Sequence, residues 1–166
     1  MSTIYDKKLS LQDAVLKRIN LEKEGKKLVV TNGCFDLLHC GHMYFLMRAR
    51  AKGDCLFVLM NSDYSVQQLK GLKRPIIPEK DRMFQLSCLD FVDGVILFPF
   101  TNCAEALRQL KPDVYVKGLD YDANSINKDE RDVLMSIPAS IEFIPLLPEY
   151  STTNLITKIQ KLMEED

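Results

Sequence analysis

Short, continuous apolar runs alternate along this chain with longer stretches in which apolar residues recur at helical spacing. The runs 28–30 and 55–60 are wholly apolar, which is typical of strands covered on both faces. Within 11–24 the apolar residues follow one helix face, and Ser10 before them is a typical N-cap. The pattern predicts strands at 28–31, 55–60, 92–98, 113–117 and 141–145, and helices at 11–24, 42–52, 79–90, 103–110, 129–135 and 153–164, with a short helix opened by 61–63 that runs to about 70.

This order of elements predicts an α/β fold. Strands that alternate with helices form a doubly wound parallel sheet, and such sheets bind ligands at the carboxyl ends of their strands, where the strand order reverses. Two prolines make 71–78 a loop, and 118–128 is expected to be another. A length of 166 residues without an internal repeat or linker fits a single domain over 1–166, with an N-terminal helix and lead-in over 1–27.

The stretch 31–42 joins the first predicted strand to the helix after it, and it holds both histidines of the sequence. His39 and His42 are three residues apart, so both imidazoles can face one side of the helix end. We expect the helix to begin at His42, where unpaired backbone amides attract anions, and Gly41 to leave room for a phosphate near the backbone. Either histidine alone would be explained as a cap or loop residue, but the combination predicts a phosphate site.

Composition and charge limit the classes of protein to consider. The formal net charge is −1 and 46% of residues are hydrophobic, as in an ordinary soluble globular protein. The sequence has no membrane-length apolar run and no signal-peptide core, and its five cysteines lack a regular spacing, so we expect a cytoplasmic location and no membrane partner. Residues 46–82 carry eight Lys or Arg against four Asp or Glu, and 118–166 carry four against ten. This asymmetry suits a small anionic ligand better than nucleic acid, and an unevenly charged surface explains it equally well.

Several common site motifs are missing from the sequence. It has no Walker motif, no Gly-x-Gly-x-x-Gly fingerprint and no Gly-x-Ser-x-Gly nucleophile elbow. Zinc is disfavoured because its candidate ligands lack a Cys-x-x-Cys pair and crowd into nine positions. These candidates are Cys34, His39, Cys40 and His42. No side chain is therefore a certain metal ligand, and Asp36 stays open either to orient its loop or to assist a metal ion.

Gly33-x-Phe35-Asp36-x-x-His39-x-Gly41-His42 resembles the signature of the nucleotidylyltransferase superfamily, which contains the cytidylyltransferases and related adenylyltransferases. Later segments resemble the adenylyltransferase domain for heptose 1-phosphate in lipopolysaccharide precursor synthesis, and they are 61–71 with 74–76, 117–121 and 150–156. The resemblance runs from about residue 10 to 160. It implies a Rossmann-like, three-layer αβα nucleotidylyltransferase fold with 28–166 as the catalytic core.

The resemblance implies an enzyme that transfers AMP from ATP to a sugar 1-phosphate, D-glycero-D-manno-heptose 1-phosphate, with ADP-heptose and pyrophosphate as products. The acceptor phosphate is already anionic, so catalysis rests on positioning and charge neutralisation rather than on a strong base. Mg²⁺ is expected to arrive with ATP, held mainly by phosphate and water oxygens. The resemblance also implies a homodimer, and a separate kinase that supplies the sugar 1-phosphate.

The same resemblance assigns roles to individual residues. Catalytic roles fall to His39, His42 and Lys117. Nucleotide binding falls to Gly33, Cys34, Phe35, Asp36, Gly41, Gly118, Asp120, Tyr121, Ser151, Thr152 and Thr153. Substrate binding falls to Asn61, Asp63, Lys70 and Arg74.

Simpler explanations stay open for several of these residues. The run 151–153 can be an ordinary helix cap, and Asp36 can bond to local amides at a turn. Lys70 and Arg74 can belong to a solvated loop. Arg82 either reaches the site or pairs with an acidic neighbour on its own helix.

Departures from the family pattern leave the choice of nucleotide open. Cys40 stands where related domains often have Pro, Leu119 where they usually have Gly, and Pro148-Glu149 where they tend to have Glu-Gly. The last two changes lie near the expected base and phosphate pockets. The alternatives are a glycerol-3-phosphate-type cytidylyltransferase that uses CTP, a flavin adenylyltransferase, and a non-catalytic nucleotide-binding module.

Overall fold

The computed structural model describes residues 4–118, 126–148 and 150–164, and within them the chain forms one sheet of six parallel strands. The strand order is β1-β4-β3-β2-β5-β6. The strands are β1 (Lys8–Leu9), β2 (Leu28–Gly33), β3 (Cys55–Asn61), β4 (Gly94–Phe98), β5 (Val114–Gly118) and β6 (Ser140–Ile144). The doubly wound parallel sheet expected from the sequence is confirmed.

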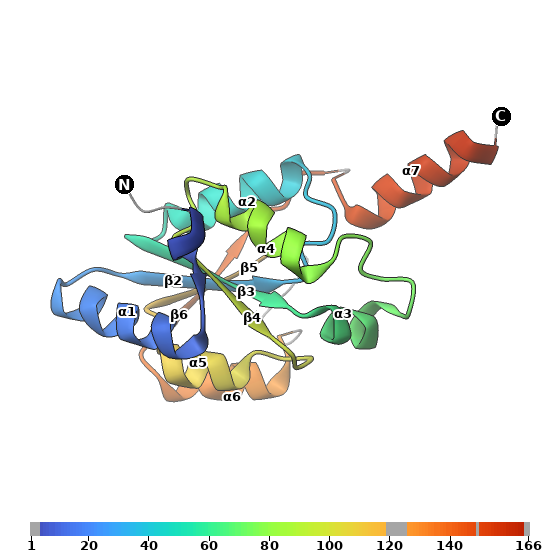
Figure 1. The fold of residues 1–166 in the computed structure, drawn as a ribbon. Helices are drawn as coiled ribbons and strands as arrows, with labels where there is room; N and C mark the ends of the chain where they lie inside the picture. The colour runs from blue at the N-terminus through green and yellow to red at the C-terminus, as the bar shows by residue number, and fades with distance from the viewer. Residues whose placement is uncertain (1–3, 119–125, 149, 165–166) are drawn as a thin grey trace.

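Helices cover both faces of this sheet and complete the three layers (Figure 1). Helices α2 and α4 lie on one face, and α1, α5 and α6 lie on the other. The helices are α1 (Leu11–Lys23), α2 (Cys40–Arg50), α3 (Asp63–Lys70), α4 (Glu79–Ser87), α5 (Ala104–Leu110), α6 (Lys128–Ser136) and α7 (Thr152–Glu164), and a 3-10 turn, η1 (Ile4–Lys7), precedes β1.

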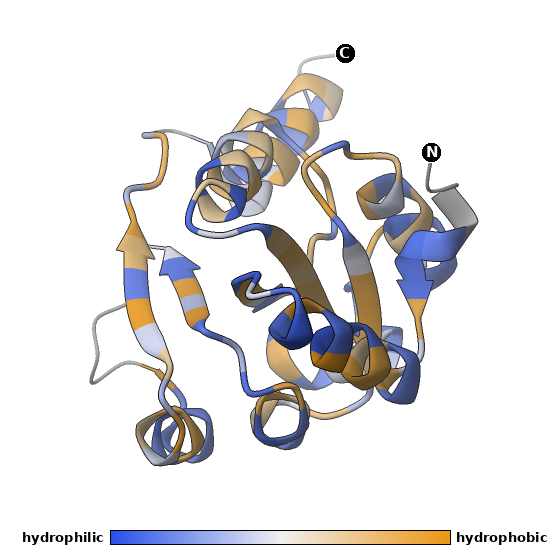
Figure 2. Cartoon of the chain, turned by 90° about the vertical axis from the view of Figure 1, so that its left-hand side faces the viewer, coloured by the Kyte–Doolittle hydropathy of each residue, from blue (hydrophilic) through white to orange (hydrophobic). Residues whose placement is uncertain are grey.

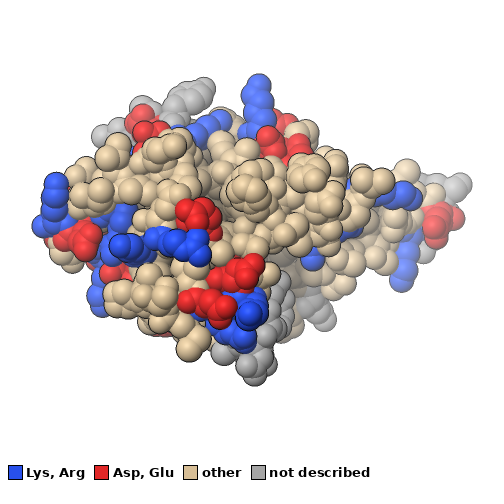
Figure 3. All heavy atoms as spheres, turned by 90° about the horizontal axis from the view of Figure 1, so that it is seen from below, with Lys and Arg blue, Asp and Glu red and all other residues tan. Residues whose placement is uncertain are grey.

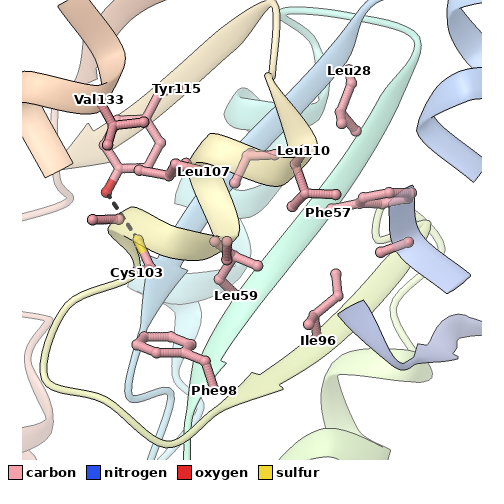
Figure 4. Close-up of a cluster of buried hydrophobic side chains, with 14 of the residues drawn as sticks. Leu28, Phe57, Leu59, Ile96, Phe98, Cys103, Leu107, Leu110, Tyr115 and Val133 are labelled. Atoms are coloured by element: carbon pink, nitrogen blue, oxygen red, sulfur yellow. Dashed lines mark hydrogen bonds between the residues drawn. The ribbon is translucent and has the colours of Figure 1, made fainter. Parts of the chain in front are cut away.

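The central strands feed two apolar cores, one on each side of the sheet. On β2, Leu28 and Val30 belong to the core under α1, α5 and α6, which Figure 4 shows with Leu107 and Leu110 of α5. Val29 between them belongs to the opposite core, under α2 and α4. Both sides are therefore apolar, and Figure 2 shows strands of the sheet interior as mainly hydrophobic.

Helix α2 begins two residues earlier than the sequence predicted. His39 adopts an extended conformation, and its carbonyl accepts hydrogen bonds from the amides of His42 at 2.9 Å and Met43 at 3.2 Å. The helix therefore begins at Cys40, and His42 lies inside the first turn. Strand β1 was not predicted, because two residues are too short to show a pattern; it pairs with β4.

The strand order reverses beside β2. The chain runs from β2 to β3 and β4 on one side, and then returns to place β5 on the other side of β2. Helices that leave neighbouring strands in opposite directions open a crevice at the carboxyl ends of those strands. The loop with both histidines follows β2, and Lys117 and Gly118 end β5, so both predicted site segments meet there.

On the face of the molecule that Figure 3 shows, basic and acidic side chains lie interspersed among neutral ones, and neither charge dominates. Helix α7 leaves the body of the protein and projects outward (Figure 1). In the described part of the chain, no helix combines the length and apolar character needed to cross a membrane.

Candidate active site

A cleft of about 660 Å³ lies at the carboxyl ends of the strands. It gathers most of the predicted site residues, namely Gly33, Cys34, Phe35, Asp36, His39, Gly41, His42, Asn61, Lys70, Arg74, Lys117, Gly118, Ser151, Thr152 and Thr153. Asp63 is not among the lining residues. Asp120 and Tyr121 lie outside the described residues. Contact of any of these residues with a ligand stays a prediction.

The loop between β2 and α2 turns back at Phe35, whose φ of 49° lies in the left-handed region. The Phe35 ring is buried, and its centroid lies 5.5 Å from that of the His42 ring. A Cβ at Gly33 would lie 3.0 Å from this ring, so the glycine makes room for it. The left-handed turn at Phe35 therefore places a buried aromatic ring next to His42, which this ring supports.

The two histidine rings are stacked, with centroids 3.9 Å apart and planes 30° from parallel. They present their imidazoles together, as their spacing predicted. A Cβ at Gly41 would lie 2.9 Å from His39 Nδ1 and 2.9 Å from Tyr150 Cβ. The direction in which a side chain at Gly41 would point is therefore occupied by the His39 ring and Tyr150, and the approach of a phosphate to the Gly41 backbone stays a prediction.

Burial favours the neutral form of both imidazoles. Removal from solvent lowers the pKa of His42 from 6.5 to about 4, with a smaller effect from the nearby His39, and it also lowers the pKa of His39. The Nδ1 atoms of both rings are shielded from solvent, and no hydrogen-bond partner for them occurs among the described residues. A neutral imidazole that lacks a hydrogen-bond partner can donate its N–H to an anionic ligand, or can become protonated when such a ligand binds next to it.

Asp36 lines the cleft and fastens the loop 71–78 beside it. Its carboxylate accepts from Arg74 Nε at 2.6 Å and from the amides of Ile76 at 2.8 Å and Ile77 at 2.9 Å. Burial by itself would raise the Asp36 pKa, but these two amides and Arg74 outweigh it and lower the pKa. The alternative of bonds to nearby turn amides is thus wrong in detail, because the amides lie about forty residues away.

Arg82 explains why Asp63 stays out of the cleft. This fully buried guanidinium donates to the carbonyls of Cys34 at 2.5 Å, Asn61 at 2.9 Å and Ile77 at 2.9 Å, and to the Asp63 carboxylate at 2.7 Å. It neither lines the cleft nor pairs with an acidic neighbour on α4, so both alternatives for Arg82 are wrong. Arg82 ties together the chain segments that support the cleft.

Lys117 reaches the cleft from β5 and is anchored to β2. Its Nζ donates to Asn32 Oδ1 at 2.6 Å, and the Tyr115 hydroxyl donates to the same oxygen at 2.8 Å. Together with Lys70 and Arg74, Lys117 gives the cleft three cationic side chains. Such a set of cations suits a polyphosphate.

The start of α7 forms the wall beside the histidines. Ser151 caps this helix, because its Oγ accepts from the Asn154 amide at 3.0 Å and its carbonyl accepts from the Leu155 amide at 3.0 Å. Helix capping, the simpler explanation from the sequence, therefore holds for Ser151. Tyr150 before it stacks against His39, with ring centroids 6.4 Å apart.

This geometry agrees with the comparison against protein families. Residues 30–158 match the family described as "Cytidylyltransferase-like". The chain belongs to the cytidylyltransferase-like family. The match spans β2 to α7, so it covers every segment that lines the cleft.

Individual proteins of known name are also similar to this chain. "Bifunctional protein HldE" of Geobacter metallireducens is 41% identical over 162 residues, which is 97% of this chain and 33% of that protein. The protein of the same name from Halorhodospira halophila is 45% identical over 136 residues, or 82% of this chain and 28% of that protein. The chain thus spans a third or less of these relatives.

Two solved structures share the fold. The "lipopolysaccharide core biosynthesis protein" from Thermoplasma volcanium superposes with a TM-score of 0.64 at 30% identity, covering 74% of this chain and 99% of the other. A pantoate-beta-alanine ligase from Francisella tularensis has a TM-score of 0.58 at 15% identity, over 95% of this chain and 78% of the other. At that identity the second likeness shows the fold alone.

Several residues that line or support this cleft were not assigned to it from the sequence, among them Asn32, Tyr115, Glu130 and Tyr150. Asn32 and Tyr150 stand inside or beside the quoted motifs, so their positions offered a signal. Tyr115 and Glu130 did not, because only the packing of α6 against β5 and α5 brings them under the cleft.

The two described carboxylates that line the cleft accept hydrogen bonds from protein donors, which bears on the expected Mg²⁺. Asp36 holds the 71–78 loop, and Glu130 accepts from the Cys103 amide at 3.0 Å. Among the described residues, no group of three or more His, Cys, Asp or Glu side chains gathers in a way that could hold a metal ion. The described side chains alone thus form no magnesium cage, and an ion held mainly by phosphate and water oxygens stays an expectation.

Proposed function

We propose that this chain is a nucleotidylyltransferase that transfers AMP from ATP to D-glycero-D-manno-heptose 1-phosphate, releasing ADP-heptose and pyrophosphate. The family match supports nucleotidyl transfer. The motifs at 61–71, 117–121 and 150–156, the relatives named HldE and the lipopolysaccharide core biosynthesis protein support the heptose acceptor.

One observation carries the proposal: two stacked, neutral histidines at the start of α2 share a cleft with Lys117 and with the hydroxyl-bearing start of α7. A triphosphate in this cleft would have imidazoles and helix-end amides on one wall, a lysine at the floor and hydroxyls on the other wall. Such a set of donors neutralises charge that builds up on phosphate oxygens.

The transfer needs positioning more than proton removal. A phosphate oxygen of the acceptor forms a bond to the α-phosphorus of ATP, while the bond from that phosphorus to the bridging oxygen breaks and pyrophosphate departs with the electron pair. His39 and His42 donate N–H groups to the phosphates, and Lys117 balances the charge of the leaving group. Lys70 and Arg74 are in place to hold the acceptor phosphate.

The proposal includes a cytoplasmic enzyme that works as a homodimer. All five cysteines are free, which suits a reducing compartment. Light scattering on the purified protein tests the dimer, and a monomer at working concentration would contradict it.

The test is pyrophosphate release with ATP, CTP, GTP and UTP, each paired with heptose 1-phosphate and with glycerol 3-phosphate. We expect release with ATP and the heptose phosphate. The His39→Ala and His42→Ala variants should each lose about a hundredfold or more in turnover, comparable to removing one transition-state donor. Met47→Ala, on the exposed side of the same helix, is the matched control and should keep full turnover.

Release with CTP and glycerol 3-phosphate would keep the chemistry and replace the heptose assignment with the cytidylyltransferase alternative. Normal turnover in both histidine variants, with folding checked by circular dichroism, would remove the histidines from the mechanism. Silence in every pairing would contradict the proposed reaction.

A further inference from the structure

Glu130 is a buried carboxylate directly beneath the cleft, although no motif marks it. It comes from the first turn of α6 and is 3% exposed. One carboxylate oxygen accepts from the Cys103 amide at 3.0 Å. The other lies 3.1 Å from the Tyr115 hydroxyl and 3.8 Å from Lys117 Nζ. Figure 4 shows the Tyr115 hydroxyl reaching the same corner of the core as Cys103.

The network joins three elements at one cation. Asn32 on β2 and Glu130 on α6 approach Lys117 on β5 from different sides, and Asn32 Nδ2 lies 3.4 Å from Glu130. The Tyr115 hydroxyl bridges the two acceptors. Burying a carboxylate is costly unless donors surround it, and here one of the nearby charges is the lysine that faces the cleft.

We infer that Glu130 is a positioning residue, whose carboxylate fixes the Lys117 ammonium on the cleft floor and thereby favours its alignment with the reacting phosphates over tight binding of ATP. The inference rests on the proposed nucleotidyl transfer. A fixed lysine stabilises charge where it develops without reorganising during the reaction. Meanwhile the carboxylate competes with the phosphates for that lysine and adds a negative charge below them.

The Glu130→Gln variant isolates this charge. Its amide oxygen can still accept from the Cys103 amide, and its NH₂ can donate to the Tyr115 hydroxyl, which can still donate to Asn32. The anchoring of α5 is therefore kept while the attraction for Lys117 is lost. Asp129→Asn is the matched control, because it removes the same charge from an exposed neighbour on α6.

The experiment measures ATP affinity by calorimetry and turnover by pyrophosphate release, with thermal stability as a folding check. Glu130→Gln should bind ATP about threefold more tightly and turn over about tenfold more slowly, the latter equivalent to one charge-assisted interaction. A damaged fold would weaken both. Asp129→Asn should change neither by more than about twofold.

A double-mutant cycle with Lys117→Met shows whether Glu130 acts through the lysine. In the Lys117→Met background, Glu130→Gln should change affinity and turnover by less than about twofold. Equal effects in both backgrounds, or unchanged turnover in Glu130→Gln alone, would overturn the inference. If no acceptor supports turnover, the proposed function fails, but the ATP-affinity cycle still decides whether Glu130 acts through Lys117.

Discussion

Helices α2 and α7 both begin at the cleft, yet they are held in place in different ways. Helix α2 buries Gly41, Phe45, Leu46 and Ala49 against the sheet. Helix α7 buries none of its thirteen residues and leaves the body of the protein (Figure 1). One wall of the cleft is thus part of the core, whereas the other starts where Tyr150 meets His39 and Gly41 and buries no residue of its helix.

The two walls of the cleft are therefore preorganised to different degrees. The histidines are locked by packing, so ligand binding needs little rearrangement of α2. The hydroxyls of α7 stand on a helix with few tertiary contacts, and local stability follows buried apolar contact. The α7 wall should therefore be the part of the cleft that a ligand orders.

The largest change in the free energy of unfolding is expected when packing is disrupted on α2, and the same substitution on α7 should have little effect. Leu46→Ala on α2, at a site with 0% exposure, should lower the free energy of unfolding by about 2–5 kcal/mol. The identical change Leu162→Ala on α7, at 57% exposure, should alter it by less than about 0.5 kcal/mol. Urea denaturation measures both, and similar losses would mean that α7 is packed as firmly as α2.

A second prediction uses the pH dependence of the packed side. Because burial lowers the pKa of His42 from 6.5 to about 4, the unfolded chain binds protons there before the folded chain does, and stability is lost as the pH falls. Between pH 7 and pH 5 His42 should account for a loss of about 2 kcal/mol. The His42→Gln variant should lack this part of the loss in urea denaturation at each pH.

The other groups that titrate in this protein should affect the wild type and the His42→Gln variant alike. The fold lowers the pKa of Asp36, so the stability that this carboxylate contributes is present at neutral pH. That stability is lost only when the pH falls below the ordinary range of carboxyl groups, which lies below the interval from pH 7 to pH 5. His39 remains in both proteins and titrates in the same direction. Identical pH profiles for the two proteins would show that His42 is not held neutral by the fold.

The parts of the fold that follow from local pattern could be predicted from the sequence. The apolar runs gave the central strands, and the caps at Ser10 and 61–63 gave helix starts near their observed positions. The start of α2 was displaced because the extended backbone at His39 is set by the loop and not by propensity. The two-residue β1 exists only through its pairing with β4, which no local pattern encodes.

The site divides in the same way. Residues carried by a contiguous motif, such as His39 and His42, could be placed in the cleft in advance. Asp63 is not among the residues lining the cleft, and its carboxylate pairs with Arg82 from another helix. Glu130 gave no signal because its role depends on contacts with β5 and α5. A single sequence does not show which residues far away along the chain pair with a charged side chain.

The smallest predicted effect compares two serine caps. Ser10 caps α1 through the Asp13 amide at 3.1 Å, as Ser151 caps α7 through the Asn154 amide at 3.0 Å. Replacing an N-cap serine by alanine costs about 1 kcal/mol of helix stability. Because α1 packs on the core, Ser10→Ala should lower global stability by about that amount. Ser151→Ala should leave global stability unchanged.

Hydrogen exchange locates the effect of Ser151→Ala. The amides in the first turn of α7 should exchange about fivefold faster than in the wild type, while those of α2 stay the same, because about 1 kcal/mol of local opening is at stake. Added ATP should slow exchange in α7 more than in α2, since α7 is the wall that a ligand orders. Equal protection of both helices by ATP, or a global loss in Ser151→Ala matching that in Ser10→Ala, would mean that the two walls are equally preorganised.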